Sequence, residues 1–354
     1  MKILLLSADN LYLVPYKDLY ISILKKNNID YDIVYWDKTN SENINKNNYI
    51  RYNPKGKTKL KKFVNYIKFR HIIKKKICEN KYDYIIGFHQ IVNLLIADIL
   101  LKHFKKKFIY DVRDYSYEYM PFVRWIEYLL VKSSKMNIIS SEGFEKFLPK
   151  SNYHIVHNLP PVIDEQYKQL KNNEKFERVV ISYIGLIRFF DQNYKIINFF
   201  ANDDRFLLQF FGTGSEKLRD YCVKENILNV SFIGTFPQNM TLEYYNNTDL
   251  IMNLYGNDTP LLDYALSNKL YYSASLYKPI LVCKGTYMEE ISHQFGFGYT
   301  LELKSDNEKD ALFRYIKNID RKTLIKNCNR FMEKVSLEHS KVVNELDNVL
   351  RNKK

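Results

Sequence analysis

The sequence predicts an α/β protein built from two doubly wound parallel sheets, and two observations carry this prediction. Short apolar runs alternate with longer stretches of helical periodicity, a pattern typical of parallel sheets covered by helices. This alternation is interrupted once, at His157-Asn158-Leu159-Pro160-Pro161 and the polar stretch that follows, which marks a domain boundary. With 354 residues and 46% hydrophobic content, the chain is large enough for two ordinary cores.

Before this boundary, short apolar runs predict strands that are separated by helical segments. The predicted strands are residues 3–7, 31–36, 84–87, 108–111 and 136–140. The predicted helices are residues 16–26, 59–79, 91–104 and 119–132, and residues 38–57 read as a long polar loop.

After the boundary, a second alternation begins and continues to the end of the chain. The predicted strands are residues 179–184, 206–211, 230–233, 249–254 and 280–283. The predicted helices are residues 194–201, 216–225, 241–246, 268–276, 308–318, 321–333 and 337–349. The predicted division is a domain of residues 1–158, a linker of residues 159–178, a domain of residues 179–335 and a C-terminal helix of residues 336–354.

Composition excludes several classes of protein. The four cysteines, Cys78, Cys222, Cys283 and Cys328, are scattered, which fits neither a zinc site nor a disulfide framework and favours a reducing compartment. The opening MKILLLSADN is too short an apolar run for a signal peptide and predicts a buried strand. No run of eighteen apolar residues predicts a membrane-spanning helix. We therefore expect a cytoplasmic protein.

Most of the positive charge lies in the first third of the chain. Residues 1–110 carry 22 Lys and Arg against 9 Asp and Glu, which accounts for 13 of the formal net charge of +14. Residues 55–76 alone carry ten Lys and Arg and no acid. Such an imbalance indicates an anionic partner for this part of the chain.

The basic segment 55–76 overlaps a predicted helix whose apolar side is interrupted. That side consists of Phe63, Tyr66, Ile67, Arg70, Ile73 and Ile77. A helix with a wholly basic polar face favours adsorption on an anionic membrane surface. A core-facing helix with a solvated basic face has the same pattern. Nucleic acid is the least favoured partner, because no RNA-binding, zinc-finger or helix-turn-helix signature is present.

Glycine and basic residues follow two predicted strand ends in the second half. Gly185 and Arg188 follow the strand 179–184, and Gly212 ends the strand 206–211. Ligands of open α/β sheets bind outside the carboxyl ends of strands. A glycine allows close backbone approach, and an arginine can bind a diphosphate with two hydrogen bonds. Tight turns with a surface arginine are the alternative interpretation.

The stretch 249–290 provides a second set of candidate ligand-binding residues. Asn268 and Lys269 open the helix 268–276, where a lysine is unfavourable for the helix dipole unless it binds an anion. Gly285 and Thr286 open the next helix, whose free N–H groups can hold phosphate. An ordinary glycine turn with a threonine cap is the alternative there.

The loop and helix of the same stretch contain two candidate carboxylates. Tyr255 begins the polar loop 255–260, where Asp258 can hold a sugar hydroxyl or simply serve as a turn aspartate. Only one of two adjacent glutamates on a helix can face a ligand, and we favour Glu289 as the catalytic candidate.

In the first half, Tyr110-Asp111-Val112-Arg113-Asp114-Tyr115 ends a predicted strand. Asp114 is a candidate general base, with Arg113 as an orienting partner. A buried network of salt bridges is the alternative interpretation. His89 follows another strand end and is a second candidate, although a lone histidine is more often structural.

The order of several motifs resembles that of GT-B-fold glycosyltransferases, in which two Rossmann-like domains face a cleft. The resemblance is greatest to the family 4-type retaining bacterial enzymes that build capsular or other surface polysaccharides. The motifs are YIGLIR, FFGTGSE, VSFIGTF, DLIMNLY, NKLYYSASLYKPILVCKGTYMEEI and FGFGYTL after the boundary, and YDVRDY, NIISSEGFEKFLP and IVHNLP before it.

The resemblance implies that the second domain binds a nucleotide-diphosphate sugar and the first domain an acceptor. The donor-side residues it implies are Gly185, Arg188, Gly212, Tyr255, Asp258, Asn268, Lys269, Tyr272, Gly285 and Thr286. Catalysis in such folds needs no bound metal or other cofactor, because cationic side chains and helix dipoles offset the leaving-group charge. The implied acceptor is a lipid-linked oligosaccharide at the inner face of the cell membrane, where the protein would be peripherally bound.

The chain also departs from this family. Tyr264 and Tyr272 stand where many members have carboxylates, and the loop 9–15 replaces a glycine-rich loop. A sugar-nucleotide epimerase or hydrolase of the same fold, or a non-catalytic sugar- or lipid-binding protein, is therefore an alternative. An oxidoreductase is disfavoured, because no GxGxxG follows residues 3–7 or 179–184.

Overall fold

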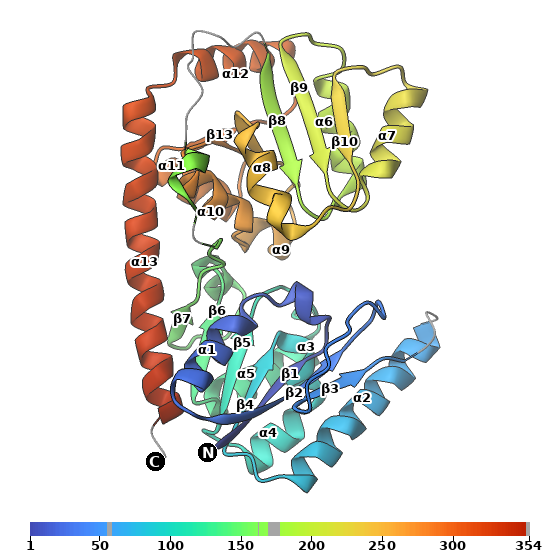
Figure 1. Cartoon of the computed structure of the whole chain (residues 1–354), viewed down its shortest axis with the longest axis vertical. Helices are drawn as coiled ribbons and strands as arrows, with labels where there is room; N and C mark the ends of the chain where they lie inside the picture. Colours follow the sequence, from blue (N-terminus) through green and yellow to red (C-terminus); the bar gives the residue numbers. More distant parts are fainter. Residues whose placement is uncertain (55–58, 162, 169–177, 352–354) are drawn as a thin grey trace. The chain divides into compact units, whose positions relative to one another are not determined.

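The computed structural model describes residues 1–54, 59–161, 163–168 and 178–351. It contains two compact units, Met1–His157 with Glu338–Lys354, and Asn158–Leu337. Each unit is built around one parallel sheet with helices on both faces (Figure 1), which confirms the predicted fold class. No helix within the described ranges is long and apolar enough to cross a bilayer.

The first unit contains a seven-stranded sheet in the order β3-β2-β1-β4-β5-β6-β7. Every strand pair is parallel. The strands are β1 (Lys2–Ser7), β2 (Asp30–Trp36), β3 (Tyr49–Tyr52), β4 (Tyr84–Phe88), β5 (Phe108–Val112), β6 (Met136–Ile139) and β7 (Tyr153–Ile155). The central strands are apolar throughout, because helices cover both faces of the sheet.

One face of this sheet packs on α1 (Lys17–Lys26) and the C-terminal part of α13 (Arg321–Arg351). The right-handed crossovers place the remaining helices on the opposite face, where Figure 1 shows α2 and α4 side by side. These helices are α2 (Lys59–Glu79), α3 (Gln90–Leu95), α4 (Ala97–His103) and α5 (Pro121–Ser133). The short 3₁₀ turns of this unit are η1 (Leu11–Leu13) and η2 (Glu142–Lys146).

Three predictions for the first unit were wrong in detail. The loop predicted at 38–57 contains the edge strand β3, and its residues 55–57 lie outside the described chain. The helix predicted at 91–104 is two helices, because the fully buried Ile96 leaves helical geometry at φ −118° and ψ 22°. The predicted apolar side of α2 is divided, since Phe69 and Ile73 are buried whereas Phe63 and Ile67 are exposed.

The second unit contains a six-stranded sheet in the order β10-β9-β8-β11-β12-β13, again with parallel pairs. The strands are β8 (Val179–Ile184), β9 (Phe206–Phe211), β10 (Val230–Ile233), β11 (Leu250–Asn253), β12 (Ile280–Val282) and β13 (Gly298–Thr300). Strands β8 and β11 diverge into connections on opposite sides, which makes their junction the topological switch point.

Two apolar cores cover the two faces of this second sheet. The first includes α6 (Phe190–Phe199), α7 (Ser215–Lys224) and α12 (Asp306–Asn318). The second includes α8 (Thr241–Asn246), α10 (Asn268–Ser275), α11 (Tyr287–Gln294) and the N-terminal part of α13. The remaining short elements are η3 (Glu165–Lys168), η5 (Gln238–Met240) and α9 (Pro260–Tyr264).

The predicted break between helices 321–333 and 337–349 does not occur, because α13 is continuous. It contains no Gly or Pro, and Val335 at the predicted break is buried in the core of the second unit. Further along the same helix, Val342, Leu346 and Leu350 belong to the core of the first unit.

Candidate functional site

Lys269 is a buried cation at the carboxyl edge of the second sheet. The residue is buried in the first turn of α10, with 6% of its surface exposed. The ammonium donates a 2.7 Å hydrogen bond to the Tyr255 hydroxyl and lies 4.4 Å from the centre of the Tyr183 ring. Among the described residues no acid pairs with it. A buried charge without a counterion is costly, so this geometry suits an anionic ligand.

The local sequence explains why Lys269 occupies this position. The Ser267 side chain caps α10 by accepting the Lys269 N–H at 3.3 Å, which fixes Lys269 in the first turn. Burial tends to raise the pKa of the Tyr255 phenol, but the Lys269 charge and hydrogen bond outweigh it and hold that pKa below its ordinary value of 10. The Lys269 charge therefore favours the ionised form of the Tyr255 phenol.

Gly185 is favoured by its backbone conformation, and Gly212 is required by close backbone packing. A Cβ on Gly185, which has φ +125°, would lie 3.8 Å from the Lys269 ammonium. A Cβ on Gly212 would lie 1.8 Å from the Gly185 carbonyl oxygen, so a side chain cannot be accommodated there. The structure thus places Gly185 beside the lysine and gives Gly212 the role of supporting the Gly185 turn.

Three further predicted residues flank this group. Arg188 is exposed, and its backbone N–H donates to the Tyr183 hydroxyl at 3.3 Å. Asn268 is exposed at the start of α10. Tyr272 is half-buried and stacks on Tyr245 with ring centres 4.9 Å apart, so this position presents an aromatic surface.

Gly285, Thr286 and Glu289 form the N-terminal cap of α11. The Thr286 hydroxyl oxygen accepts the Glu289 N–H at 3.2 Å, and the Glu289 carboxylate accepts the Gly285 N–H at 2.7 Å. Glu289 also accepts the Thr300 hydroxyl at 2.6 Å. The N–H of Gly285 is therefore already bonded to a carboxylate, and a phosphate contact at this turn stays a prediction, as does a catalytic role of Glu289.

Asp258 lies in the turn that precedes α9, with φ 68°. Its backbone N–H donates to the Asp263 carboxylate at 2.9 Å, and Thr259 caps α9. The structure gives Asp258 a turn position, and its sugar-binding role remains a prediction.

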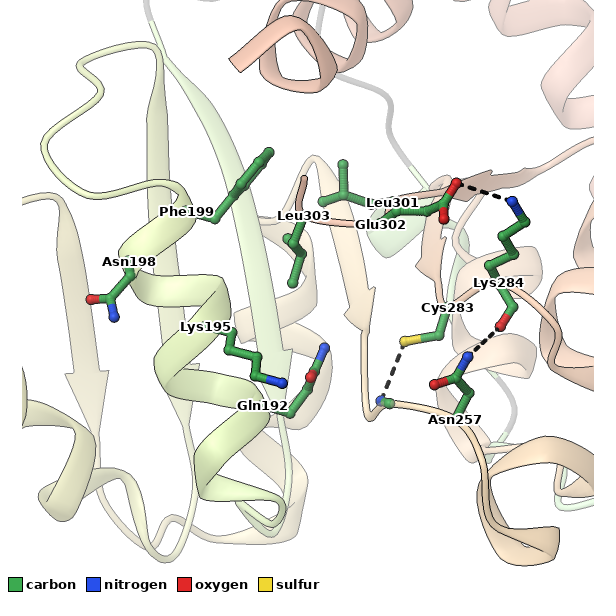
Figure 2. A pocket seen from close by; sticks show the side chains of 11 residues that line it. Gln192, Lys195, Asn198, Phe199, Asn257, Cys283, Lys284, Leu301, Glu302 and Leu303 are labelled. Carbon is green, nitrogen blue, oxygen red and sulfur yellow. Dashed lines mark hydrogen bonds and ion pairs between the residues drawn. The ribbon is translucent and has the colours of Figure 1, made fainter. Parts of the chain in front are cut away.

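A pocket of about 650 Å³ lies on the α6 side of the same sheet edge. It is lined by Gln192, Lys195, Asn198, Phe199, Gly256, Asn257, Cys283, Lys284, Leu301, Glu302 and Leu303. Figure 2 shows Gln192 and Lys195 extending from α6 toward the loop of Asn257 and Cys283. None of the residues predicted to bind the sugar donor lines this pocket. The Gly256 N–H donates a hydrogen bond to the Cys283 Sγ at 3.3 Å, which connects the loops after β11 and β12.

In the first unit, the Arg113 side chain is buried and hydrogen-bonded to other buried groups. Its guanidinium makes two hydrogen bonds to Asp111, at 2.5 and 2.9 Å, and donates to the Val156 carbonyl at 2.8 Å. The Tyr20 hydroxyl donates to Asp111 at 2.5 Å. The prediction left a buried salt-bridge network as an alternative, and for Arg113 and Asp111 the structure has this arrangement.

His89 and Asp114 are brought together at the edge of the same network. The His89 Nδ1 lies 3.7 Å from the Asp114 carboxylate, and its Nε2 lies 2.8 Å from the Tyr16 hydroxyl. Burial lowers the pKa of His89 more than the nearby Asp114 charge raises it, so the imidazole is held neutral. His89 also has φ 67°, an uncommon conformation that clusters at functional sites. A neutral imidazole at a strand end can accept a proton.

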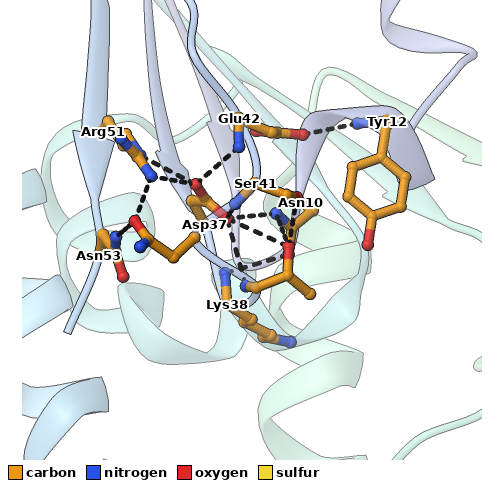
Figure 3. Close-up of polar contacts among 10 residues, drawn as sticks. Asn10, Tyr12, Asp37, Lys38, Ser41, Glu42, Arg51 and Asn53 are labelled. Carbon is orange, nitrogen blue, oxygen red and sulfur yellow. Dashed lines mark hydrogen bonds and ion pairs between the residues drawn. The ribbon is translucent and has the colours of Figure 1, made fainter. Parts of the chain in front are cut away.

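Sequence reasoning missed the network that replaces the glycine-rich first loop (Figure 3). The buried Asp37 accepts hydrogen bonds from Asn10 at 2.5 Å, from Arg51 at 2.9 Å and from the Glu42 N–H at 3.1 Å. Glu42 in turn accepts the Tyr12 N–H at 2.8 Å. Burial raises the pKa of Asp37, but these donors outweigh it and bring the value to about 2. The network fixes the loop 9–15 by side chains.

Sequence reasoning also missed two buried acids behind Asp114. Glu127 accepts hydrogen bonds from Gln90 at 2.7 Å and from Tyr110 at 2.8 Å. Glu118 accepts the Ser116 N–H at 2.6 Å. Burial raises the pKa of Glu118 to about 7, with the Glu127 charge adding to it. Glu118 precedes α5 and Glu127 lies on it, and neither has a sequence signal, because burial depends on tertiary packing.

Comparison with known proteins identifies the fold. No known protein family profile matches the chain, and no curated protein sequence matches it significantly. Solved structures do match over nearly their full length. Sucrose-phosphate synthase from Thermosynechococcus elongatus aligns with a TM-score of 0.72 at 11% identity and covers 99% of this chain and 98% of its own.

Two other solved structures give the same result. HepE from Anabaena, solved in complex with UDP and glucose, aligns with a TM-score of 0.66 at 13% identity, covering 98% of this chain and 99% of its own. WaaG, a glycosyltransferase involved in lipopolysaccharide biosynthesis, aligns with a TM-score of 0.63 at 12% identity, covering 98% and 99%. At such identities the likeness establishes the fold, which is GT-B.

Proposed function

We propose that this chain is a glycosyltransferase that uses a nucleotide-diphosphate sugar. The observation that carries the proposal is the buried Lys269 ammonium, which has aromatic and phenolic neighbours beside Gly185 but no acid among the residues that the structure describes. A diphosphate would provide the missing negative charge at the edge where such sheets bind ligands. The fold supports the proposal, since the HepE structure holds UDP and glucose.

In the proposed reaction, an acceptor hydroxyl oxygen bonds to the anomeric carbon and the bond from that carbon to the diphosphate oxygen breaks. Lys269 and Arg188 stabilise the negative charge that develops on the departing nucleoside diphosphate. His89 and Asp114 are the acceptor-side groups, and the neutral His89 imidazole can accept the hydroxyl proton. The resemblance to family 4-type enzymes supports retention of configuration.

The proposed acceptor is a lipid-linked saccharide in surface polysaccharide synthesis, reached from the inner face of the cell membrane. The basic segment 55–76 supports this assignment, and the described part of α2 exposes Lys61, Lys68, Lys74 and Lys75. Residues 55–58 of that segment lie outside the described chain. A non-catalytic protein of the same fold is the second candidate, favoured by Tyr264 and Tyr272 at positions where carboxylates are usual.

The test is a thermal-shift titration of the whole chain with UDP, GDP, ADP, CDP and their sugars, because a ligand that binds the native state raises the melting temperature. We expect a shift with one nucleotide class. Lys269→Met keeps the aliphatic stem against the Tyr183 ring but removes the charge, and should weaken binding by about 2–3 kcal/mol. Arg188→Ala should weaken it by about 1.5–3 kcal/mol.

Lys224→Met is the matched control, because this lysine is exposed on α7 and should leave binding unchanged. A shift that survives Lys269→Met would remove the lysine from the site. Binding of a nucleotide sugar without transfer to any lipid-linked acceptor would favour the non-catalytic candidate, and its turnover without acceptor would favour an epimerase or hydrolase.

A further inference from the structure

Exposed large apolar side chains are concentrated in the first unit. Within residues 119–128 there are five of them, and residues 63–67 and 12–13 contribute three and two more. We call these ten residues the apolar surface: Tyr12, Leu13, Phe63, Val64, Ile67, Tyr119, Met120, Phe122, Trp125 and Tyr128. Scattered apolar residues on a surface are ordinary, whereas a cluster marks an interaction site.

The structure brings the three segments of the apolar surface toward one another. Arg70 of α2 donates to the Leu95 carbonyl at 2.5 Å and binds the Asp98 carboxylate at 2.7 and 2.8 Å, which ties α2 to α3 and α4. Contacts of α5 with α3 and α4 continue this layer. Burial raises the pKa of Tyr66 on α2 to about 12, and the charges of Tyr117, before α5, and Asp9, before η1, add to it.

The N-terminal half of α5 turns its aromatic side chains outward. Phe122 and Trp125 are 67% and 60% exposed, and their rings stack with centres 6.5 Å apart. The opposite side of the helix buries Leu130 and Val131. This half of the helix is therefore not a solvated polar face, and its aromatic residues are the type enriched at membrane interfaces.

The exposed charges on α2 and α5 are basic except for Glu79 at the end of α2. Of the nearby acids, Asp98 is paired with Arg70 and Asp9 with Lys38. Residues 59–78 contain no acid, and the only acid within α5 is Glu127, which is buried and bonded to Gln90 and Tyr110. The exposed faces of α2 and α5 carry Lys61, Lys68, Lys74, Lys75 and Arg124. Stable peripheral membrane binding requires two signals, such as apolar insertion together with basic residues, and this surface provides both.

We propose that the apolar surface inserts into the interfacial layer of an anionic membrane, with the α5 aromatics entering the layer and the α2 lysines binding lipid headgroups. This deepens the proposed function, on which it rests for the choice of a membrane as partner. It assigns α5 and η1, which the sequence pattern did not single out, to membrane binding. It also gives a reason for the outward position of Phe63 and Ile67.

The test measures binding of the whole chain to lipid vesicles by flotation. We expect binding to vesicles with roughly 30% phosphatidylglycerol and weaker binding to pure phosphatidylcholine, because the lysines contribute only on the anionic surface. Phe122→Ser with Trp125→Ser should lower binding to the anionic vesicles by about tenfold or more. Lys68→Gln with Lys75→Gln should lower it on anionic vesicles alone.

The chain provides its own control and its own probe. Val223 and Leu228 of the second unit are 77% and 79% exposed, and their replacement by serine should leave vesicle binding unchanged. The chain has two tryptophans, and Trp36 is buried, so a blue shift of tryptophan fluorescence on adding vesicles reports Trp125. Phe122→Ser alone preserves this probe.

Several results would overturn the membrane assignment. Two concern the vesicles: binding that is unaffected by the Phe122 and Trp125 replacements, or no blue shift with anionic vesicles. Two concern other partners: dimerisation of the free chain that these replacements abolish, or binding of a soluble saccharide to this surface without vesicle binding. Loss of nucleotide binding in Lys269→Met with unchanged vesicle binding would show that the two sites are separate. Vesicle binding with no nucleotide binding by the unmodified chain would sink the proposed transferase but leave this surface standing.

Discussion

The carboxyl edges of the two sheets are both polar, but the first buries acids with their hydrogen-bond partners whereas the second buries a lysine. The edge of the first unit buries the acids Asp37, Asp111, Glu118 and Glu127, and its buried Arg113 is fully engaged with Asp111. The edge of the second unit buries Lys269, which no acid among the described residues neutralises. The first edge is stabilised by its own pairs, whereas the second is complementary to an anion that the described part of the chain does not provide.

The largest effect on stability should come from breaking the Asp111–Arg113 pair in the first unit. Asp111→Asn leaves the buried Arg113 guanidinium without its charged partner, which should cost about 3–5 kcal/mol of unfolding free energy. Urea denaturation measures this loss. Asp220→Asn, on the exposed face of α7, is the control and should change stability by less than about 0.5 kcal/mol. Equal effects of the two replacements would mean that the pair is not a source of stability.

A pH-dependent effect should come from Glu118. Its pKa is raised from 4.5 to about 7 in the folded protein, so the folded state binds more protons than the unfolded state between these values. Stability therefore falls as pH rises from about 4.5 to about 7 and is then constant. Glu118→Gln keeps the hydrogen bond from the Ser116 N–H and removes the ionisation, so the variant should lack this decline.

The Glu118 prediction is measured by urea denaturation of both proteins at several pH values. The stability difference between them should widen by on the order of 3 kcal/mol at most between pH 4.5 and 8, since one pKa unit corresponds to about 1.4 kcal/mol. Parallel pH profiles for the two proteins would contradict the burial of a protonated carboxyl at this edge. Such a result would also weaken the contrast between the two edges.

The smallest effect should come from the cap of α11. Glu289→Ala removes the carboxylate that accepts the Gly285 N–H and the Thr300 hydroxyl, and should cost about 1 kcal/mol of stability. Thermal denaturation measures it, with the adjacent exposed Glu290→Ala as the control. The Glu289→Ala variant also tests whether the edge of the second unit binds phosphate. Stronger nucleotide binding by this variant would indicate that the carboxylate competes with phosphate at the Gly285 turn.

The sequence by itself determined the two-sheet architecture and the positions of most strands. Apolar runs such as residues 179–184 and 280–283 can only be buried on both faces, which requires a parallel sheet covered by helices. The sequence also predicted Gly185 and Lys269 as binding residues from local signals, and the structure places the two side by side. A glycine after a strand and a lysine at a helix start are visible without any tertiary contact.

Only the tertiary structure decided which charges are paired. Arg113 and Lys269 look alike in the sequence, since each is a cation near a strand or helix end, yet one meets Asp111 and the other meets Tyr183 and Tyr255. The outward aromatics of α5 and the buried Glu118 likewise depend on how that helix packs. Pairing and burial are set by residues far apart in the chain, and no local pattern contains that information.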